Sequence, residues 1–260
     1  MFRHQKELQF EAKPDKPNPL IAKYLQELIG GQYGEMSVAM QYLFQGWSCR
    51  GEEKYKDMLM DIATEELGHV EMLATMVARL LEGAPVEDQE EAMKKDPTIG
   101  AIISGMNPQH AIVAGLGPRP ADSVGNPWSG GYIIASGNML ADFRANLNAE
   151  SQGRLQVARI YEMIDDRGVK DLLSVLLARD SYHQNLWASA VKELETKEGS
   201  ILVPSTFPRE EERLDIAYDF YNFSEGDASS QGSWASGKAL DGEGEYQWLR
   251  SEEHTSELQS

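Results

Sequence analysis

The chain has 260 residues, 41% hydrophobic and 25% charged, which is the balance of an ordinary globular protein. Its formal net charge of −18 disfavours nucleic acid or an anionic membrane surface as a partner. The single cysteine, Cys49, excludes an intramolecular disulfide framework and favours a reducing compartment. Since no apolar run approaches the ~18 residues of a membrane span, we expect a cytoplasmic protein.

The N-terminal half predicts an arm, two helices and the start of a long connection. Residues 1–19 are polar and contain three prolines, so we expect an extended arm. Helical patterns follow over residues 20–47 and 52–82. Residues 85–130 contain six of the eleven prolines, which predicts a long crossover.

The C-terminal half predicts two further helices, over residues 132–166 and 169–198, separated at Arg167 and Gly168. Four helices of about 30 residues, with short links inside each half and one long crossover between the second and third, are typical of a ferritin-like four-helix bundle. We therefore predict an all-α fold whose bundle spans residues 20–198, followed by an irregular C-terminal extension. A generic helical domain is the alternative.

The Gly/Ser-rich extension, residues 199–249, is expected to be irregular and to make subunit contacts, with a possible short helix over 209–220. The last eleven residues, 250–260, read RSEEHTSELQS. They resemble one reading-frame translation of a common sequencing adapter, although a natural polar tail is the alternative. On the adapter interpretation the genuine sequence ends near Leu249.

Two predicted helices each carry an acid and a histidine at the centre of an apolar seam. Stepping by three and four along the second helix gives Leu, Ile, Glu66, His69, Leu, Met and Leu. The same stepping along the fourth helix meets only apolar residues except Asp180 and His183. In each pair the two residues are three apart and therefore lie on one helix face.

The other two helices each place one acid inside an apolar stripe: Glu35 in the first and Glu150 in the third. Glu35 precedes the Glu-x-x-His pair of the second helix by 31 and 34 residues. Glu150 precedes the Asp-x-x-His pair of the fourth helix by 30 and 33 residues. Each half is thus a helical hairpin with the same acidic and imidazole groups at the same depth. Arg154, one turn from Glu150, could instead neutralise that acid.

Four buried carboxylates at one depth would repel one another and would each be costly to desolvate. Two divalent cations would remove both penalties. A Glu from each of two helices and an acid-x-x-His motif from each of the others is the pattern of dinuclear carboxylate proteins. Oxygen and imidazole ligands without a thiolate suit manganese or iron. A metal-free network of buried salt bridges is the alternative interpretation.

Several segments resemble the non-haem manganese catalases, which are dimanganese enzymes of the ferritin-like superfamily. The resemblance runs from residue 1 to about residue 227 and includes MFRHQKELQF and GMNPQHAIVAGLG. It is carried mainly by four helical segments: GGQYGEMSVAMQYLFQGW, GEEKYKDMLMDIATEELGHVEML, SGNMLADFRANLNAESQGRLQVARIY and LLARDSYHQ. The spacing of the ligands alone does not choose between manganese and iron.

The resemblance implies a ligand set for two manganese ions per subunit. Glu35 and His69 would bind one manganese, and Glu150 and His183 the other. Glu66 would bridge the two metals and belong to the catalytic group.

The resemblance also implies roles around the metals. Tyr42 would hydrogen-bond next to the site. Asp180 stands where well-known members carry a glutamate that acts as an outer-sphere acid/base. Ala149 stands where some members carry an arginine over the site. The two differences bear on proton transfer and access, and a shorter acid could act through one water.

Some members of the family bind calcium between the subunits of a homohexamer. Asp57 and Asp61 match two of the calcium carboxylates, and Asn222, Ser224 and Gly226 match the ligands from a neighbour's tail. The alternative is that the two aspartates form a solvated face and that NFSEGD is a turn.

The activity that the resemblance implies is the disproportionation of hydrogen peroxide to water and dioxygen, with the metals cycling between Mn(II)₂ and Mn(III)₂. Hydrogen peroxide would be the substrate and the protein a homohexamer, with neither nucleic acid nor membrane as partner. Two alternatives remain: another di-metal oxidase that uses iron, and a structural relative of the spore-coat type.

Overall fold

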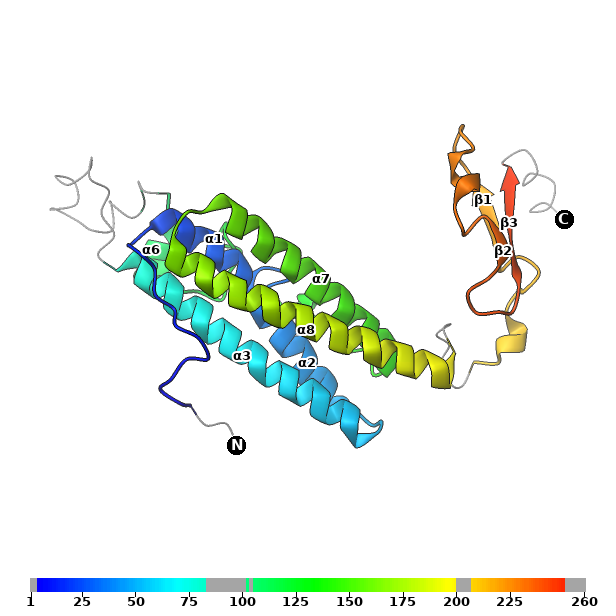
Figure 1. Ribbon diagram of the computed structural model, residues 1–260, viewed down its shortest axis with the longest axis horizontal. Coiled ribbons are helices and arrows are strands. Elements are labelled where there is room, and N and C mark those ends of the chain that lie inside the picture. The colour runs from blue at the N-terminus through cyan, green and yellow to red at the C-terminus, as the bar shows by residue number, and fades with distance from the viewer. Residues whose placement is uncertain (1–3, 83–101, 103–104, 200–206, 251–260) are drawn as a thin grey trace. The chain divides into compact units, whose positions relative to one another are not determined.

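The computed structural model describes residues 4–82, 102, 105–199 and 207–250. The chain divides into two compact units, whose boundaries are Met1–Val191 and Lys192–Ser260. The first unit is a bundle of long helices that lie side by side along its length (Figure 1). It comprises α1 (Pro19–Gly30), α2 (Glu35–Ser48), α3 (Glu53–Leu81), α7 (Met139–Met163) and most of α8 (Arg167–Glu198).

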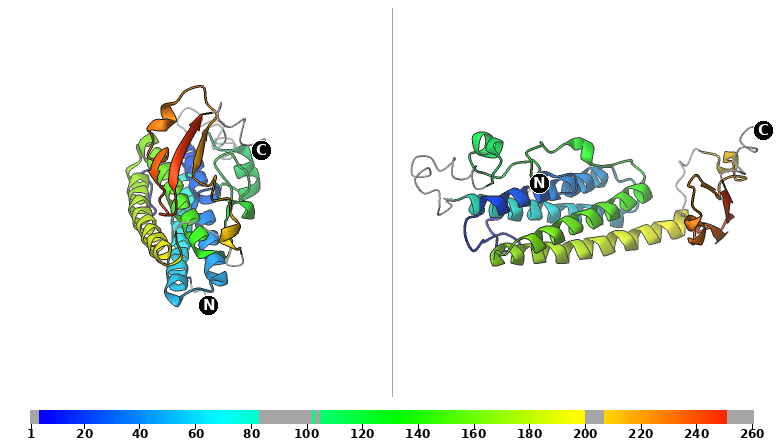
Figure 2. Two further views of the ribbon diagram at one scale, coloured as in Figure 1. Left: turned by 90° about the vertical axis from the view of Figure 1, so that its right-hand side faces the viewer. Right: turned by 90° about the horizontal axis from the view of Figure 1, so that it is seen from above.

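The helical fold that the sequence predicts is confirmed, but its first helix is interrupted. Residues 31–34 separate α1 from α2, which follow one another beside α3 (Figures 1 and 2). A Cβ on Gly30 would lie 2.3 Å from the backbone nitrogen of Ala121, so the crossover approaches too closely for a larger residue. Gln26 holds the crossover there by donating to the carbonyl oxygen of Ala121 at 2.9 Å. After the link, α2 begins at Glu35, with Gly34 at its N-cap position.

The ends of the other helices differ from the predicted ones by a few residues. Residues 130–132 form a 3-10 turn, and α7 begins at Met139 because the Asn138 side chain caps it, accepting from the Ala141 amide at 3.0 Å. Gly168 lies inside the first turn of α8 and does not separate two helices. Asp166 caps this turn by accepting from Val169 N at 3.0 Å.

The N-terminal arm lies along the bundle. Arg79 on α3 donates to the carbonyl oxygen of Ala12 at 2.5 Å. Gln9 donates to Glu65 on α3 at 2.9 Å, and Asp166 accepts from the Asp15 amide at 3.0 Å. In the crossover, the described part contains the short helix α6 (Pro108–Ala114), and residues 85–101 of the predicted connection lie outside the described residues.

The bundle core has two apolar regions. One is an aliphatic region around Leu25, Met72 and Leu173, all fully buried. The other is an aromatic region in which the Tyr42 ring centroid lies 4.9 Å from that of Trp187, and Trp187 lies 5.2 Å from Phe143. In the sequences of α3 and α8, the acid and histidine pairs fall between the residues of these two regions.

The second unit contains a small three-stranded sheet where the sequence predicts an irregular extension. Its strands are β1 (Asp219–Asn222), β2 (Ser236–Lys238) and β3 (Glu245–Arg250), in the order β1-β3-β2. β1 runs parallel to β3, and β2 runs antiparallel to it. In place of the possible helix over 209–220, a 3-10 turn (Arg209–Glu211) precedes β1. Residues 251–260, which include most of the possible adapter sequence, lie outside the described residues.

Candidate metal centre

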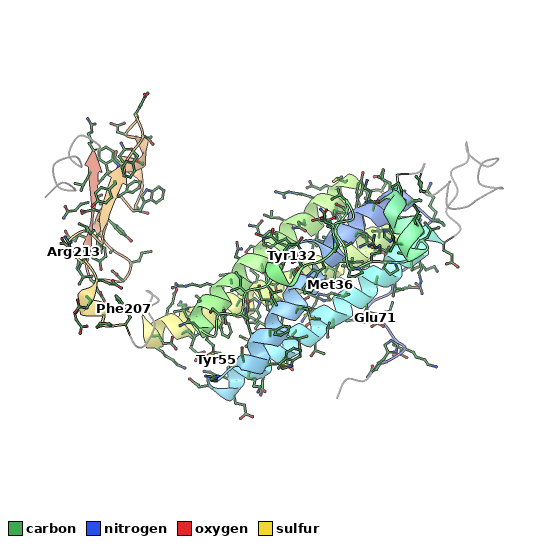
Figure 3. All side chains as sticks on the ribbon, turned by 180° about the vertical axis from the view of Figure 1, so that it is seen from behind. Met36, Tyr55, Glu71, Tyr132, Phe207 and Arg213 are labelled. Atoms are coloured by element: carbon green, nitrogen blue, oxygen red, sulfur yellow. The ribbon has the colours of Figure 1, made fainter. Side chains whose placement is uncertain are left out.

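Four helices contribute the six acidic and histidine residues that the sequence singles out. Met36, labelled in Figure 3, marks the start of α2 and follows Glu35 directly. On α3 the centre lies in the segment between the labelled residues Tyr55 and Glu71. Every one of the six is at least nine-tenths buried, with relative exposures of 7% for Glu35, 1% for Glu66, 0% for His69, 4% for Glu150, 4% for Asp180 and 0% for His183.

The structure brings five of these residues into two groups that share one carboxylate. Glu35, Glu66 and His69 form the first group, and Glu66, Glu150 and His183 form the second. Within each group the possible ligand atoms lie within 4.8 Å of one another. Asp180 is buried nearby but belongs to neither group.

Glu66 lies between the two histidines. Its Oε2 is 2.6 Å from Nδ1 of His69, and its Oε1 is 2.7 Å from Nδ1 of His183. The two imidazole rings are nearly parallel, with centroids 5.9 Å apart and planes at 26°. Each imidazole therefore turns its Nδ1 toward a different oxygen of the same carboxylate, as two metals bridged by that carboxylate would require.

These close approaches are not hydrogen bonds. Both oxygens of Glu66, both ring nitrogens of His69 and Nδ1 of His183 are buried and lack an aligned hydrogen-bond partner among the described residues. Buried polar atoms normally have such a partner. Unpaired carboxylate oxygens and imidazole nitrogens that converge on one place are a donor set suited to manganese or iron, so the residues fit a metal pair.

The electrostatics of the cluster point the same way. Burial, together with the charge of Glu66, raises the pKa of Glu35 to about 7. Burial and the charges of Glu35 and Glu66 raise the pKa of Asp180 to about 8. Burial opposes protonation of His183, but contact with Glu66 outweighs it and raises the pKa of His183 to about 9. Burial also opposes ionisation of Glu66, yet His69 and His183 lower its pKa. Without metal, this cluster retains protons that bound cations would displace.

Two aromatic side chains hold Glu150. The Tyr42 hydroxyl on α2 donates to Oε1 of Glu150 at 2.7 Å, and the Trp187 indole nitrogen on α8 donates to the same oxygen at 3.4 Å. Burial and the charge of Glu150 raise the pKa of Tyr42 well above its usual value, so this hydroxyl remains a donor. The sequence pattern assigns Trp187 only to the apolar seam.

Arg154 does not pair with Glu150 in the structure, although their spacing on one helix would allow it. The Arg154 guanidinium donates to the carbonyl oxygen of Leu177 at 2.5 Å and to the hydroxyl of Ser181, both on α8. Arg154 therefore joins α7 to α8. Ala149, which precedes Glu150, is 8% exposed.

One residue that contacts both histidines was missed by sequence reasoning. Glu65 Oε2 accepts from His183 Nε2 at 3.1 Å, and Glu65 Oε1 lies 3.7 Å from His69 Nε2. Arg179 on α8 pairs with both oxygens of Glu65. A signal was present in the sequence, because Glu65 precedes His69 by four residues and Arg179 precedes His183 by four.

The residues matched to a calcium site lie in two separate units. Asp57 and Asp61 are exposed and one turn apart on α3. In the second unit, Asn222 donates to the carbonyl oxygen of Gly226 at 2.9 Å and accepts from the Ser224 amide at 2.9 Å. These three residues therefore form a turn after β1.

Comparison with known proteins adds to this geometry. The family model described as manganese containing catalase matches residues 1–259. A manganese catalase of Bacillus subtilis (strain 168) is 66% identical over 243 residues, which cover 94% of this chain and 88% of that protein. A manganese catalase of Lactiplantibacillus plantarum is 46% identical, with 88% and 85% covered. The crystal structure of KatB, a manganese catalase from Anabaena, superposes with a TM-score of 0.74 at 28% identity, covering 96% of this chain and 99% of that one.

Proposed function

The chain belongs to the family of manganese-containing catalases, and from this premise we propose which of its residues hold the metals and move the protons. It is a manganese catalase, which converts two molecules of hydrogen peroxide to two of water and one of dioxygen. The observation that carries the residue assignment is the pair of carboxylate–histidine groups that share Glu66. The comparisons do not favour an iron oxidase or a structural relative.

For the ligands, we propose that Glu35 and His69 hold one manganese ion and that Glu150 and His183 hold the other. Glu66 would bridge the two, which its short distances to both Nδ1 atoms support. When bound, the metal pair would supply and recover the two electrons of each cycle by alternating between Mn(II)₂ and Mn(III)₂.

Asp180 is the proposed proton carrier. Reduction of one peroxide to two waters consumes two protons, and oxidation of the second peroxide to dioxygen releases two, so protons balance over the cycle. Asp180 is buried beside the centre and outside both ligand groups, so its carboxyl is free to take up a proton released there and to return it. Solvent at the centre would carry the other proton.

The surroundings position these groups and limit access by water. Tyr42 and Trp187 fix the orientation of Glu150 through their hydrogen bonds. The aliphatic and aromatic regions of the core enclose the centre with apolar side chains, which favours a small substrate such as hydrogen peroxide.

The direct test is to load the full-length protein with Mn(II), measure metal per chain and follow dioxygen release from hydrogen peroxide. We expect two manganese ions per chain and steady dioxygen evolution that cyanide, a poison of haem catalases, does not stop. Iron-loaded protein is the control and should turn over far more slowly. Absence of turnover with two manganese ions bound would contradict the proposal.

We further propose a homohexamer that binds calcium between subunits, with Asp57 and Asp61 from one subunit and Asn222, Ser224 and Gly226 from another. The exposure of both aspartates and the turn formed by the other three support it. Light scattering after gel filtration should give a hexamer with calcium and smaller species after chelation. Asp57→Asn should abolish the calcium dependence, and hexamers unaffected by chelation and by this substitution would contradict the site.

Two described features bear on location. None of the described helices is both long and apolar enough to cross a lipid bilayer. Cys49 is a free cysteine, since the chain contains no second cysteine with which it could form a disulfide. A cytoplasmic location remains our proposal, and fractionation of source cells with antibody against the protein would test it.

A further inference from the structure

Glu65 is the one described carboxylate that contacts both proposed metal-ligand histidines on the side away from the metals. Its Oε2 accepts from His183 Nε2 at 3.1 Å, and its Oε1 is 3.7 Å from His69 Nε2. The Nδ1 atoms of the same rings face Glu66 at 2.6 and 2.7 Å. Each imidazole thus lies between Glu66, which bridges the two groups, and Glu65 behind them.

Glu65 is itself held from three parts of the chain. It is a residue of α3, and Arg179 from α8 grips it with two bonds, Nε to Oε1 at 2.6 Å and Nη2 to Oε2 at 3.0 Å. Gln9 of the N-terminal arm donates to Oε1 at 2.9 Å. The guanidinium of Arg179 also lies over the ring of Tyr182, 4.9 Å from its centroid. A two-bond fork fixes the plane of a carboxylate, which a single contact cannot do.

The helical spacing places the Glu65–Arg179 ion pair one turn from each of the two histidines. Glu65 lies one turn before His69 on α3, and Arg179 lies one turn before His183 on α8. The Glu65–Arg179 pair therefore joins the two histidine-bearing helices within one turn of their ligands. A change in the separation of α3 and α8 at this level would move the two imidazoles apart.

We propose that Glu65, oriented by Arg179, is a positioning residue that keeps both imidazoles in the Nε2–H form and sets their separation, so that the two Nδ1 atoms present lone pairs to the metal pair. This inference rests on the proposed manganese ligands. A histidine that binds a metal through one nitrogen commonly donates its other N–H to a carboxylate, which fixes the tautomer and the ring orientation. Here a single carboxylate faces both rings: it accepts from Nε2 of His183 at 3.1 Å and lies 3.7 Å from Nε2 of His69, to which it makes no hydrogen bond.

The position of Glu65 also explains why it must be fixed. A pocket of about 440 Å³ is lined by Glu65, Tyr182 and His183 at one part and by Asp57 and Asp61 at another. The side chain of His183 is 1% exposed, whereas that of Glu65 is 19% exposed. Glu65 is thus the partly exposed group next to buried ligands. Displacing it would leave the Nε2 atoms open to water as an alternative partner.

The test compares three full-length variants with the wild type. Glu65→Gln removes, at nearly constant size, the negative charge that accepts from Nε2 of His183 and faces Nε2 of His69. Arg179→Lys keeps the charge but loses the two-bond fork. Arg213→Lys is the matched control, because Arg213 forms the same kind of fork with Asp215 in the second unit. Helicity by circular dichroism establishes that each metal-free variant folds.

The readouts are Mn(II) affinity, from the electron paramagnetic resonance signal of free Mn(II) during titration, and the spectrum of the bound Mn(II) pair. We expect Glu65→Gln to bind manganese 10- to 100-fold more weakly and to show an altered pair spectrum. Arg179→Lys should change both readouts in the same direction by a smaller amount, and Arg213→Lys should leave them unchanged.

The outcomes separate this inference from the proposed function. If the wild type binds two manganese ions and evolves dioxygen, while Glu65→Gln or Arg179→Lys keeps the wild-type affinity and spectrum, the positioning role is wrong and the proposed function stands. If the wild type binds fewer than two manganese ions per chain, both are wrong. Should Glu65→Gln fail to fold, Arg179→Lys alone decides between the outcomes.

Discussion

Replacing Asp180 with asparagine tests the electrostatics of the centre with and without metal. In the folded metal-free protein, burial and the charges of Glu35 and Glu66 raise the pKa of Asp180 from 3.8 to about 8. Between these two values the folded protein holds a proton that the unfolded chain has released. Because the folded state binds more protons there, its stability falls as pH rises across the window.

The size of the effect follows from the same shift. At pH 7, keeping Asp180 protonated costs the folded state up to about 4 kcal/mol, at ~1.4 kcal/mol for each pH unit above the ordinary pKa. Asparagine carries no charge at any pH and avoids this cost. Its amide requires hydrogen-bond partners, which offsets about 1–3 kcal/mol, but that penalty is the same at every pH. The change in free energy of unfolding should therefore favour Asp180→Asn by up to about 4 kcal/mol more at pH 7 than at pH 4.

Urea unfolding of chelator-treated protein, followed by circular dichroism at both pH values, measures this difference. Asp171→Asn, at an exposed position of the same helix, is the control and should shift stability by less than ~0.5 kcal/mol at either pH. With manganese bound, Asp180→Asn should keep both ions but lose about 10²- to 10⁴-fold in turnover, the range for a lost general acid–base group. Equal effects at the two pH values would refute the electrostatic reasoning, and loss of one manganese ion would make Asp180 a ligand.

Three further predictions concern the surroundings of the centre. Tyr42→Phe removes the 2.7 Å hydrogen bond to Glu150, a proposed manganese ligand, so Mn(II) affinity should fall about 10-fold or more. Isothermal titration measures the affinity, and an unchanged value would contradict the role of the hydroxyl. Mn(II) affinity should rise with pH between about 6 and 9, by up to ~10-fold per unit for each displaced proton. The reason is that, without metal, Glu35 keeps its proton up to its pKa of about 7 and His183 up to its pKa of about 9. A flat profile would refute proton displacement. Trp187→Ala, at a fully buried position, should lower the free energy of unfolding by about 3–5 kcal/mol. Trp47→Ala, at a position that is 53% exposed, is the control and should lower it by less than ~1 kcal/mol. Equal losses in urea unfolding would contradict the packing argument.

The parts of the fold that repeat along one helix could be predicted from the sequence. Apolar residues at steps of three and four located α3 and α8, and the polar interruptions Glu66, His69, Asp180 and His183 are all buried together. The break between α1 and α2 could not be found in this way, because the stripe continues in phase across it. Gln32, which belongs to that stripe, is exposed in the structure. At the end of α1 the crossover backbone at Ala121 approaches Gly30 closely, a contact distant in sequence.

The periodicity of apolar residues also could not predict which side chains make contacts between helices. Arg154 has the right spacing for Glu150 on its own helix, yet its donors reach α8 instead. Glu65 and Arg179 lie beside the seams, where a charged residue is usually solvated, and only the approach of α3 to α8 makes them a pair. The sheet of the second unit was missed because its strands are short and separated by Gly/Ser-rich turns, which resemble an irregular segment.

Because α2 begins at Glu35, the direction in which this proposed ligand points does not depend on how far α1 is rotated about its axis. An insertion of one residue into a continuous helix turns everything beyond it by about 100°, so a proposed ligand at mid-helix, such as Glu150, tolerates no length change between itself and its packing partners. Residues 31–34 absorb such a rotation before it reaches α2. A change in the length of α1 would therefore not by itself turn Glu35 away from the centre.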